Sequence, residues 1–165
     1  MRSRFVVEPH RAIGCRYGAG VSKLPDLRDF VRAEIVPPKV TLIVRGGPDS
    51  EVKLKSHAER VRRAFVLDGV PVLGISLFAA LDDIGPASLE GIQAGKVSTY
   101  RVVHLVEVGQ VLEAGFTLLP TFDRPHVTLL LDALDQVETL LKLLGPPQAN
   151  PRYGEMGHRV RRRSR

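Results

Sequence analysis

The sequence has a single cysteine and no tryptophan, and aromatic residues make up only 5% of its 165 positions. One thiol, Cys15, excludes an internal disulfide bond and any zinc site built on two or more thiolates, so we expect a reducing compartment, the cytoplasm. No stretch approaches the roughly 20 apolar residues that span a bilayer. The apolar run at residues 5–7 ends at Glu8, too soon for the core of a signal peptide. We therefore expect no membrane partner.

The few aromatic and histidine residues also limit the kinds of site. Most of the six Phe fall in apolar stripes, which leaves no obvious platform on which nucleic-acid bases could stack. Any contact with nucleic acid is therefore expected to involve its backbone. No two of the five His stand three or four residues apart, so the sequence predicts no metal site.

The bulk composition is that of a folded chain. Hydrophobic residues make up 44% and charged residues 25%, and the length suits one domain. Charge is unevenly distributed: residues 1–81 hold 14 Lys/Arg against 8 Asp/Glu, residues 82–150 hold 4 against 9, and residues 151–165 hold 6 against 1. The basic character therefore comes from the first half and the end of the chain.

Hydrophobic periodicity predicts an α+β fold. Leu54, Ala58, Val61 and Phe65 recur at helical spacing, and residues 40–44 form a β-branched run typical of a strand. The link at residues 123–125 is so short that the strands on either side must pair antiparallel. The expected helices are 25–34, 50–66, 88–93, 108–112 and 134–144, and the expected strands are 40–44, 70–78, 100–106, 116–122 and 127–131. We expect a mixed sheet, in the order β-α-β-α-β-α-β-β-α, ending in an antiparallel hairpin.

The domain boundary is expected after residue 150. Residues 1–150 form one α+β domain with a less regular section at 1–38, and residues 151–165 form a disordered basic tail. Arginine clusters bind phosphate through bidentate hydrogen bonds and counterion release. The predicted nucleic-acid-binding residues are Arg159, Arg161, Arg162, Arg163 and Arg165 of the tail, with Arg60 and Arg63 of the helix at 50–66. The alternatives for the tail are a solubility role and docking on the chain's own acidic segment.

Residues 125–129, Pro-His-Val-Thr-Leu, enter a strand from a turn. His126 and Thr128 stand two apart and so point to one side, where an imidazole and a hydroxyl could meet one phosphate. The pentapeptide resembles one half of the paired His-x-Thr/Ser signature of the two-histidine phosphoesterases, which act on RNA ends and cyclic phosphates. The resemblance implies a second histidine for general acid–base work. His104 is the nearest candidate, although Leu105 and Val106 follow it in place of the family's hydroxyl.

A second pattern joins Arg45, after the strongest predicted strand, to Ser98 and Thr99 before a later one. This arrangement is similar to the arginine and serine-threonine elements of arginine-type ADP-ribosyltransferases. The resemblance implies that Arg45 holds a phosphate of the nicotinamide cofactor and that a later glutamate, Glu107 or Glu113, orients the ribose. Gly46 and Gly47, which follow Arg45, could also cradle an anion at the start of a helix, or could serve only the turn.

Three functions remain open from the sequence. The leading hypothesis is a cytoplasmic protein that engages nucleic acid, RNA before DNA, and cuts or modifies it through His126 and Thr128 without a cofactor. The second is a toxin-like, NAD-dependent ADP-ribosyltransferase that uses Arg45. The third is a non-catalytic module that forms homo-oligomers or binds a protein partner through its uneven charge.

Overall fold

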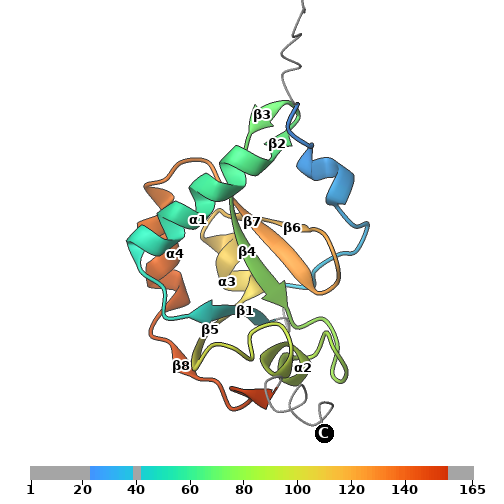
Figure 1. Cartoon of the computed structure of the whole chain (residues 1–165), viewed down its shortest axis with the longest axis vertical. Helices are drawn as coiled ribbons and strands as arrows, with labels where there is room; N and C mark the ends of the chain where they lie inside the picture. The colour runs from blue at the N-terminus through green and yellow to red at the C-terminus, as the bar shows by residue number, and fades with distance from the viewer. Residues whose placement is uncertain (1–22, 39–41, 156–165) are drawn as a thin grey trace, which may run out of the picture.

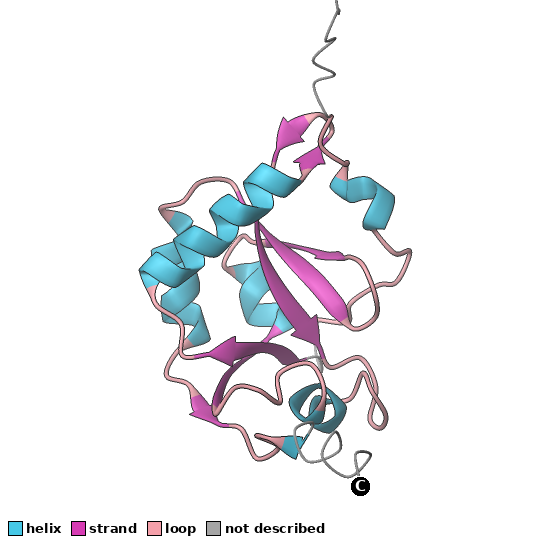
Figure 2. Cartoon of the chain, in the orientation of Figure 1, coloured by secondary structure: helices cyan, strands magenta, loops and turns pink. Residues whose placement is uncertain are grey.

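The computed structural model describes residues 23–38 and 42–155. In chain order the elements are the 3₁₀ helix η1 (Leu27–Phe30), β1 (Leu42–Gly47), α1 (Glu51–Ala64), β2 (Val66–Leu67), β3 (Val70–Pro71), β4 (Leu73–Ala79), α2 (Leu89–Ala94), β5 (Val102–Glu107), α3 (Val108–Glu113), β6 (Thr117–Pro120), β7 (His126–Leu131), α4 (Gln136–Leu144) and β8 (Gln148–Ala149). Helices lie on both sides of a twisted central sheet (Figures 1 and 2). The α+β class is therefore confirmed.

The central sheet has six strands in the order β6-β7-β4-β1-β5-β8, and every pair of neighbours is antiparallel. The antiparallel β6–β7 hairpin agrees with the sequence analysis. The expected parallel pairs do not form, because α1 does not lead the chain back past β1. Instead α1 runs from the end of β1 to the β2–β3 hairpin, and β4 returns from there in the direction opposite to β1 (Figure 1).

Strands β1 and β4 pair over a short length only. Ile43 opposes Ala79 and Val44 opposes Phe78, after which the two strands diverge. On its other side β1 pairs with β5 along its whole length. The sheet therefore opens between the end of β1 and the first half of β4, beside the start of α1.

Two hydrophobic cores lie on the two faces of the sheet. The larger core packs the sheet against α1, α3 and α4, and its helical members are Leu54, Ala58, Val108, Val111, Val137, Leu140 and Leu144. The smaller core joins Val44 and Val103 of the sheet to Ile92 of α2. Leu54 and Ala58 are fully buried, which confirms the helical stripe expected there. Since α2 covers only part of its face, the opening beside β4 stays accessible.

The β2–β3 hairpin was not expected. Its two strands are joined by Asp68 and Gly69, both at positive φ (53° and 80°). Asp-Gly is a preferred sequence for such a two-residue turn, because both central residues of a type I′ turn need positive φ. The turn signal is therefore present in the sequence, but its two flanking strands have only two residues each, too few for hydrophobic periodicity to predict them.

The chain packs beyond residue 150, where the basic tail was expected to begin. The buried Asn150 side chain donates to the carbonyls of Val97 and Tyr100, and the Gly154 N–H donates to the Ser98 carbonyl at 2.8 Å. These bonds hold residues 150–154 against the loop that precedes β5. Five arginines of the predicted tail, Arg159, Arg161, Arg162, Arg163 and Arg165, lie outside the described residues, as does Cys15.

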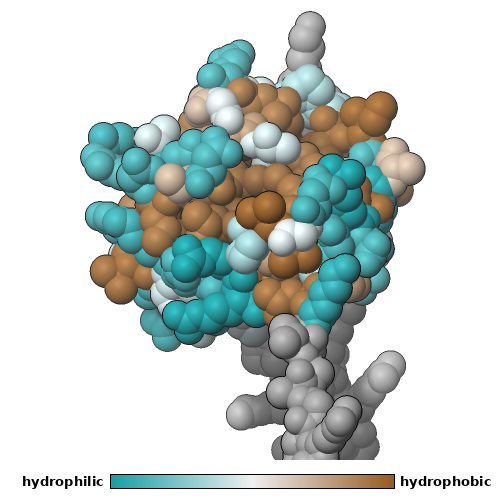
Figure 3. All heavy atoms as spheres, turned by 90° about the horizontal axis from the view of Figure 1, so that it is seen from above, coloured by the Kyte–Doolittle hydropathy of each residue, from teal (hydrophilic) through white to brown (hydrophobic). Residues whose placement is uncertain are grey.

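The surface at the end that carries the β2–β3 hairpin is mixed, with hydrophobic side chains gathered between hydrophilic ones (Figure 3). Within residues 23–38 and 42–155, no helix combines the length and apolar character required to cross a membrane.

Candidate functional site

A basic cleft of about 730 Å³ lies where β1 and β4 diverge. Its floor and walls come from the end of β1, the first turns of α1, the middle of β4 and the loop before β5. We define the basic cleft by its lining residues: Arg45, Gly46, Gly47, Pro48, Asp49, Val52, Lys53, Ser56, His57, Arg60, Ser76, Phe78, Lys96, Val97 and Tyr100. The volume falls within the range of small-ligand sites.

The charges around the cleft are nearly all positive. Lys53 and Arg60 project from one side of α1, seven residues apart, and Lys96 reaches in from the loop before β5. Asp49 is the only acidic residue among the lining residues, and Arg45 neutralises it: Arg45 Nε donates to Asp49 Oδ2 at 2.6 Å. Within the described part of the chain, no carboxylate forms an ion pair with Lys53, Arg60 or Lys96. The cleft therefore offers three cationic side chains to an anion.

Arg45 and His57 take the place of a missing neighbouring strand. The part of strand β4 that precedes Phe78 does not pair with β1. The backbone of Ser76 therefore lacks a strand partner on the side that faces β1. Arg45 Nη1 donates to the Ser76 carbonyl at 2.9 Å, and the Ser76 N–H donates to His57 Nε2 at 3.2 Å. Side chains thus satisfy both backbone groups, which would otherwise cost free energy at a half-buried position.

The environment keeps His57 neutral. Burial first, and then the nearby charges of Arg45 and Arg60, lower the pKa of His57 to about 4. A protonated ring carries a hydrogen on both nitrogens, so it would place Nε2–H against the N–H of Ser76. His57 is therefore a hydrogen-bond acceptor inside the cleft, and it adds no charge near neutral pH.

Gly46 and Gly47 are needed for close packing. A Cβ at Gly47 would lie 2.8 Å from the imidazole of His104, and a Cβ at Gly46 would meet the ring of Tyr100. His104 is buried and joins two elements: it accepts from the Asp49 N–H through Nε2 and bonds the Gly145 carbonyl through Nδ1. The two glycines thus allow the buried His104 and the cleft-lining Tyr100 to lie directly against β1.

Comparison with known proteins adds no identity. No family model, curated protein or solved structure matches the chain.

His126 and Thr128 do lie on one side of β7, as the sequence predicted, and both reach the same hydroxyl. Thr121 Oγ1 lies 3.0 Å from His126 Nδ1 and 2.7 Å from Thr128 Oγ1. Thr121 and Thr128 are buried, and burial lowers the pKa of His126, partly offset by a hydrogen bond to the Thr121 backbone. In this structure the imidazole and the hydroxyl meet Thr121 at the position where a phosphate was expected.

The structure does not bring His104 and His126 together. Opposed residues of an antiparallel pair point to the same face of the sheet. His104 opposes Arg45 and shares the larger core's face, whereas His126 opposes Phe78 and shares the face of the smaller core. The two histidines therefore do not form an acid–base pair on one face.

The residues of the ADP-ribosyltransferase pattern do not form one accessible site either. Arg45 lines the cleft, but its side chain is engaged by Asp49 and Ser76. Ser98 is 1% exposed, and its hydroxyl donates to the Gly95 carbonyl. Thr99 is exposed but is not among the lining residues. Of the suggested glutamates, Glu107 caps α3 at the far end of β5 from Val102, and Glu113 ends that helix.

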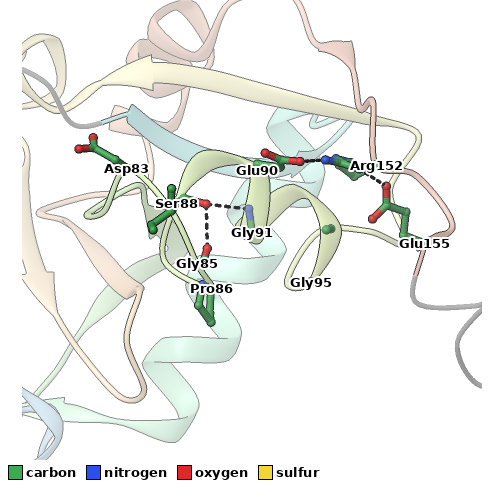
Figure 4. Close-up of a pocket in the computed structure, with 11 residues that line it drawn as sticks. Asp83, Gly85, Pro86, Ser88, Glu90, Gly91, Gly95, Arg152 and Glu155 are labelled. Atoms are coloured by element: carbon green, nitrogen blue, oxygen red, sulfur yellow. Dashed lines mark hydrogen bonds and ion pairs between the residues drawn. The ribbon is translucent and has the colours of Figure 1, made fainter.

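A second hollow, of about 540 Å³, lies beside α2 (Figure 4). Its charged lining residues are Asp83, Glu90, Glu155 and Arg152. Arg152 lies between Glu90 and Glu155 and pairs with both carboxylates, as the dashed lines in Figure 4 show. One arginine of the predicted basic tail thus meets the acidic half of the chain. The mainly acidic lining makes this hollow a poor place for a phosphate.

Two basic residues of the cleft, Arg45 and Arg60, were predicted as site residues from the sequence. Arg63 is exposed on α1 but is not among the residues that line the cleft. Lys53, Lys96, His57 and Tyr100 were missed. Helical spacing could have grouped Lys53, His57 and Arg60, whereas nothing local in the sequence links Lys96 to them. Within the described residues, no cluster of His, Cys, Asp and Glu could hold a metal ion.

Proposed function

We propose that this protein binds nucleic acid, RNA in the first instance, by holding backbone phosphates in the basic cleft. One observation carries the proposal: Lys53, Arg60 and Lys96 converge on the cleft without a carboxylate partner among the described residues. Exposed lysine and arginine clusters of this kind attract phosphates and release counterions on binding. RNA is placed before DNA because the His126–Thr128 element resembles a family that acts on RNA ends.

The proposal does not extend to cleavage of the RNA. The Thr128 hydroxyl is buried against Thr121, and His104 belongs to the other face of the sheet from His126. A general acid and a general base must both come within hydrogen-bond reach of the scissile phosphate, directly or through one water. The described geometry supports binding, and the cytoplasm, suggested by the single cysteine, is its proposed location.

Salt-dependent affinity tests the proposal. Fluorescence anisotropy of a labelled single-stranded RNA of about 12 nucleotides, at about 50 to 200 mM salt, gives the dependence of log K on log salt. Lys53→Gln, Arg60→Gln and Lys96→Gln should each weaken binding and reduce the slope by about 1. Lys142→Gln is the matched control, because it removes the same charge from α4, outside the cleft, where Lys142 pairs with Glu138.

A further variant separates the cleft from the end of the chain. Replacing Arg159, Arg161, Arg162, Arg163 and Arg165 together by glutamine in the full chain removes the charge that the sequence analysis emphasised. If the slope responds only to this variant and not to the cleft variants, the cleft is not the binding site. If it responds to neither set, the protein does not bind RNA electrostatically and the proposal is wrong.

The geometry does not support the ADP-ribosyltransferase alternative. The side chain of Arg45 is already bonded to Asp49 and to the Ser76 carbonyl, and the side chain of Ser98 is buried. Calorimetry with the nicotinamide cofactor separates the two hypotheses. The ADP-ribosyltransferase hypothesis predicts heat on adding the cofactor, and this heat should depend on Arg45. RNA binding through Lys53, Arg60 and Lys96 predicts no such Arg45-dependent heat.

A further inference from the structure

Two of the residues that line the cleft are Phe and Tyr, and of these Phe78 is half-buried whereas Tyr100 is exposed. Tyr100 is 46% exposed and lies against Gly46 of β1. A Cβ built on Gly46 would come closest to ring atom Cδ2 and would lie 2.6 Å from both of its neighbours, Cγ and Cε2. Near-equal distances to adjacent ring atoms are the pattern of a group above the face of a ring, not at its edge. One face of Tyr100 thus rests on the backbone of Gly46, while the residue as a whole remains 46% exposed.

The backbone of Tyr100 is fixed from two sides. Its N–H donates to the Val97 carbonyl at 3.0 Å, and its carbonyl accepts from Asn150 Nδ2 at 3.0 Å. Asn150 is only 6% exposed and also donates to the Val97 carbonyl. Because the turn is held before any ligand arrives, placing a second aromatic group on the ring loses little conformational entropy.

Cationic side chains lie along the same cleft as the ring. Lys96 precedes Tyr100 by four residues in the loop before β5, and Lys53 and Arg60 of α1 form the other side of the cleft. Proteins that bind single-stranded nucleic acids combine an aromatic face with several cations, because bases stack on the ring while phosphates contact the cations. The bases of a duplex are already stacked on one another and cannot use the ring.

We infer that Tyr100 stacks a base of single-stranded RNA while Lys53, Arg60 and Lys96 hold its phosphates, so that the cleft selects single strands over duplexes. The inference depends on the proposed RNA binding and specifies its substrate class. It also revises the expectation from the sequence, where the scarcity of aromatic residues indicated contact with the backbone alone.

Three RNA probes test the inference with the unmodified full-length protein. They are a single strand of about 12 nucleotides, the same sequence as a duplex, and an abasic strand that keeps every phosphate. Stacking of one base predicts that the single strand binds on the order of tenfold more tightly than the abasic strand. The duplex should bind no more tightly than the abasic strand, once affinity is expressed per phosphate.

Variants then assign the effect to the ring. Tyr100→Leu should weaken binding of the single strand by on the order of tenfold, leave the abasic strand unaffected and keep the salt slope, because no charge is removed. Tyr100→Phe should retain the affinity. Tyr153→Leu is the matched control, because Tyr153 is 49% exposed and lies outside the cleft.

The outcomes separate this inference from the proposed function. Equal affinity for single and abasic strands, with a slope that still responds to Lys53→Gln and Arg60→Gln, overturns the stacking role and leaves phosphate binding in place. No salt-dependent binding of any probe overturns both. Because the comparison of probes needs no variant, the inference stays testable even if Tyr100→Leu does not fold.

Discussion

His57 accepts a hydrogen bond from the backbone of Ser76 at 3.2 Å, at the point where strand β4 has lost its neighbour β1. This contact predicts a pH-dependent stability. The pKa of His57 in the folded protein is about 4, below its usual 6.5, because burial and the charges of Arg45 and Arg60 favour the neutral ring. The stabilisation is therefore fully present above about pH 6.5 and is lost as the pH falls towards 4.

Denaturant unfolding between about pH 7.5 and pH 4 measures this effect. The wild type should lose on the order of 1 kcal/mol more than His57→Gln over that range, after allowance for solvent screening of the half-exposed ring. Glutamine can still accept from Ser76 but does not titrate. Parallel curves of unfolding free energy against pH for the two proteins would show that the pKa of His57 does not change on unfolding, which would contradict the prediction.

The ion pair of Arg45 with Asp49 is the least exposed among the described residues, with side chains 12% and 4% exposed. Removing one partner leaves a charge with little access to water, so Asp49→Ala should destabilise the fold by about 3 kcal/mol. The double variant Arg45→Met, Asp49→Leu should recover part of that loss, because no unpaired charge remains, although the Ser76 carbonyl loses its Arg45 donor. A thermal or denaturant double-mutant cycle measures the coupling, and strictly additive effects would argue against a buried pair.

Gly46 and Gly47 should respond differently to the same substitution. Gly47→Ala places a methyl group 2.8 Å from the buried imidazole of His104, so it should cost about 1–3 kcal/mol of stability. Gly46→Ala displaces the ring of Tyr100, which is half-exposed and can swing outward at a smaller cost. Gly46→Ala should instead reduce affinity for single-stranded RNA. A larger loss of unfolding free energy for Gly46→Ala than for Gly47→Ala would contradict this assignment.

Variants of Thr128 show whether its hydroxyl stabilises the fold or contacts phosphate. Thr128→Val keeps the shape but removes the partner of Thr121 Oγ1 at 2.7 Å, so it should lower the unfolding free energy by about 1–2 kcal/mol. Thr128→Ser should restore most of it. RNA affinity should stay unchanged in both variants. A loss of affinity in a fully folded Thr128→Val protein would return Thr128 to the phosphate-facing role that the sequence suggested.

The sequence predicts most of the individual helices and strands because a buried face requires apolar residues at regular, local spacing. Leu54 and Ala58 stand one helical turn apart and are both fully buried, and the short link at residues 123–125 forces β6 and β7 to pair. The direction of β4 relative to β1 is not encoded in any such local pattern. It depends on the β2–β3 hairpin, which turns the chain after α1, and on side chains that satisfy the open edge of β4.

The sequence by itself determined the α+β class, the four α-helices, five of the six strands of the central sheet and the basic character of α1, because each follows from residues close together in the chain. The helix expected at residues 25–34 is instead the short 3₁₀ helix η1, and the β2–β3 hairpin and β8 were not predicted. Only the tertiary structure decided the cleft. Arg45, Arg60 and Lys96 are separated by 15 and 36 positions along the chain, and they share one site because β1 and β4 diverge beside α1. The same divergence commits Arg45 to Asp49 and Ser76, and it leaves Lys53, Arg60 and Lys96 around the opening, where a phosphate can be held.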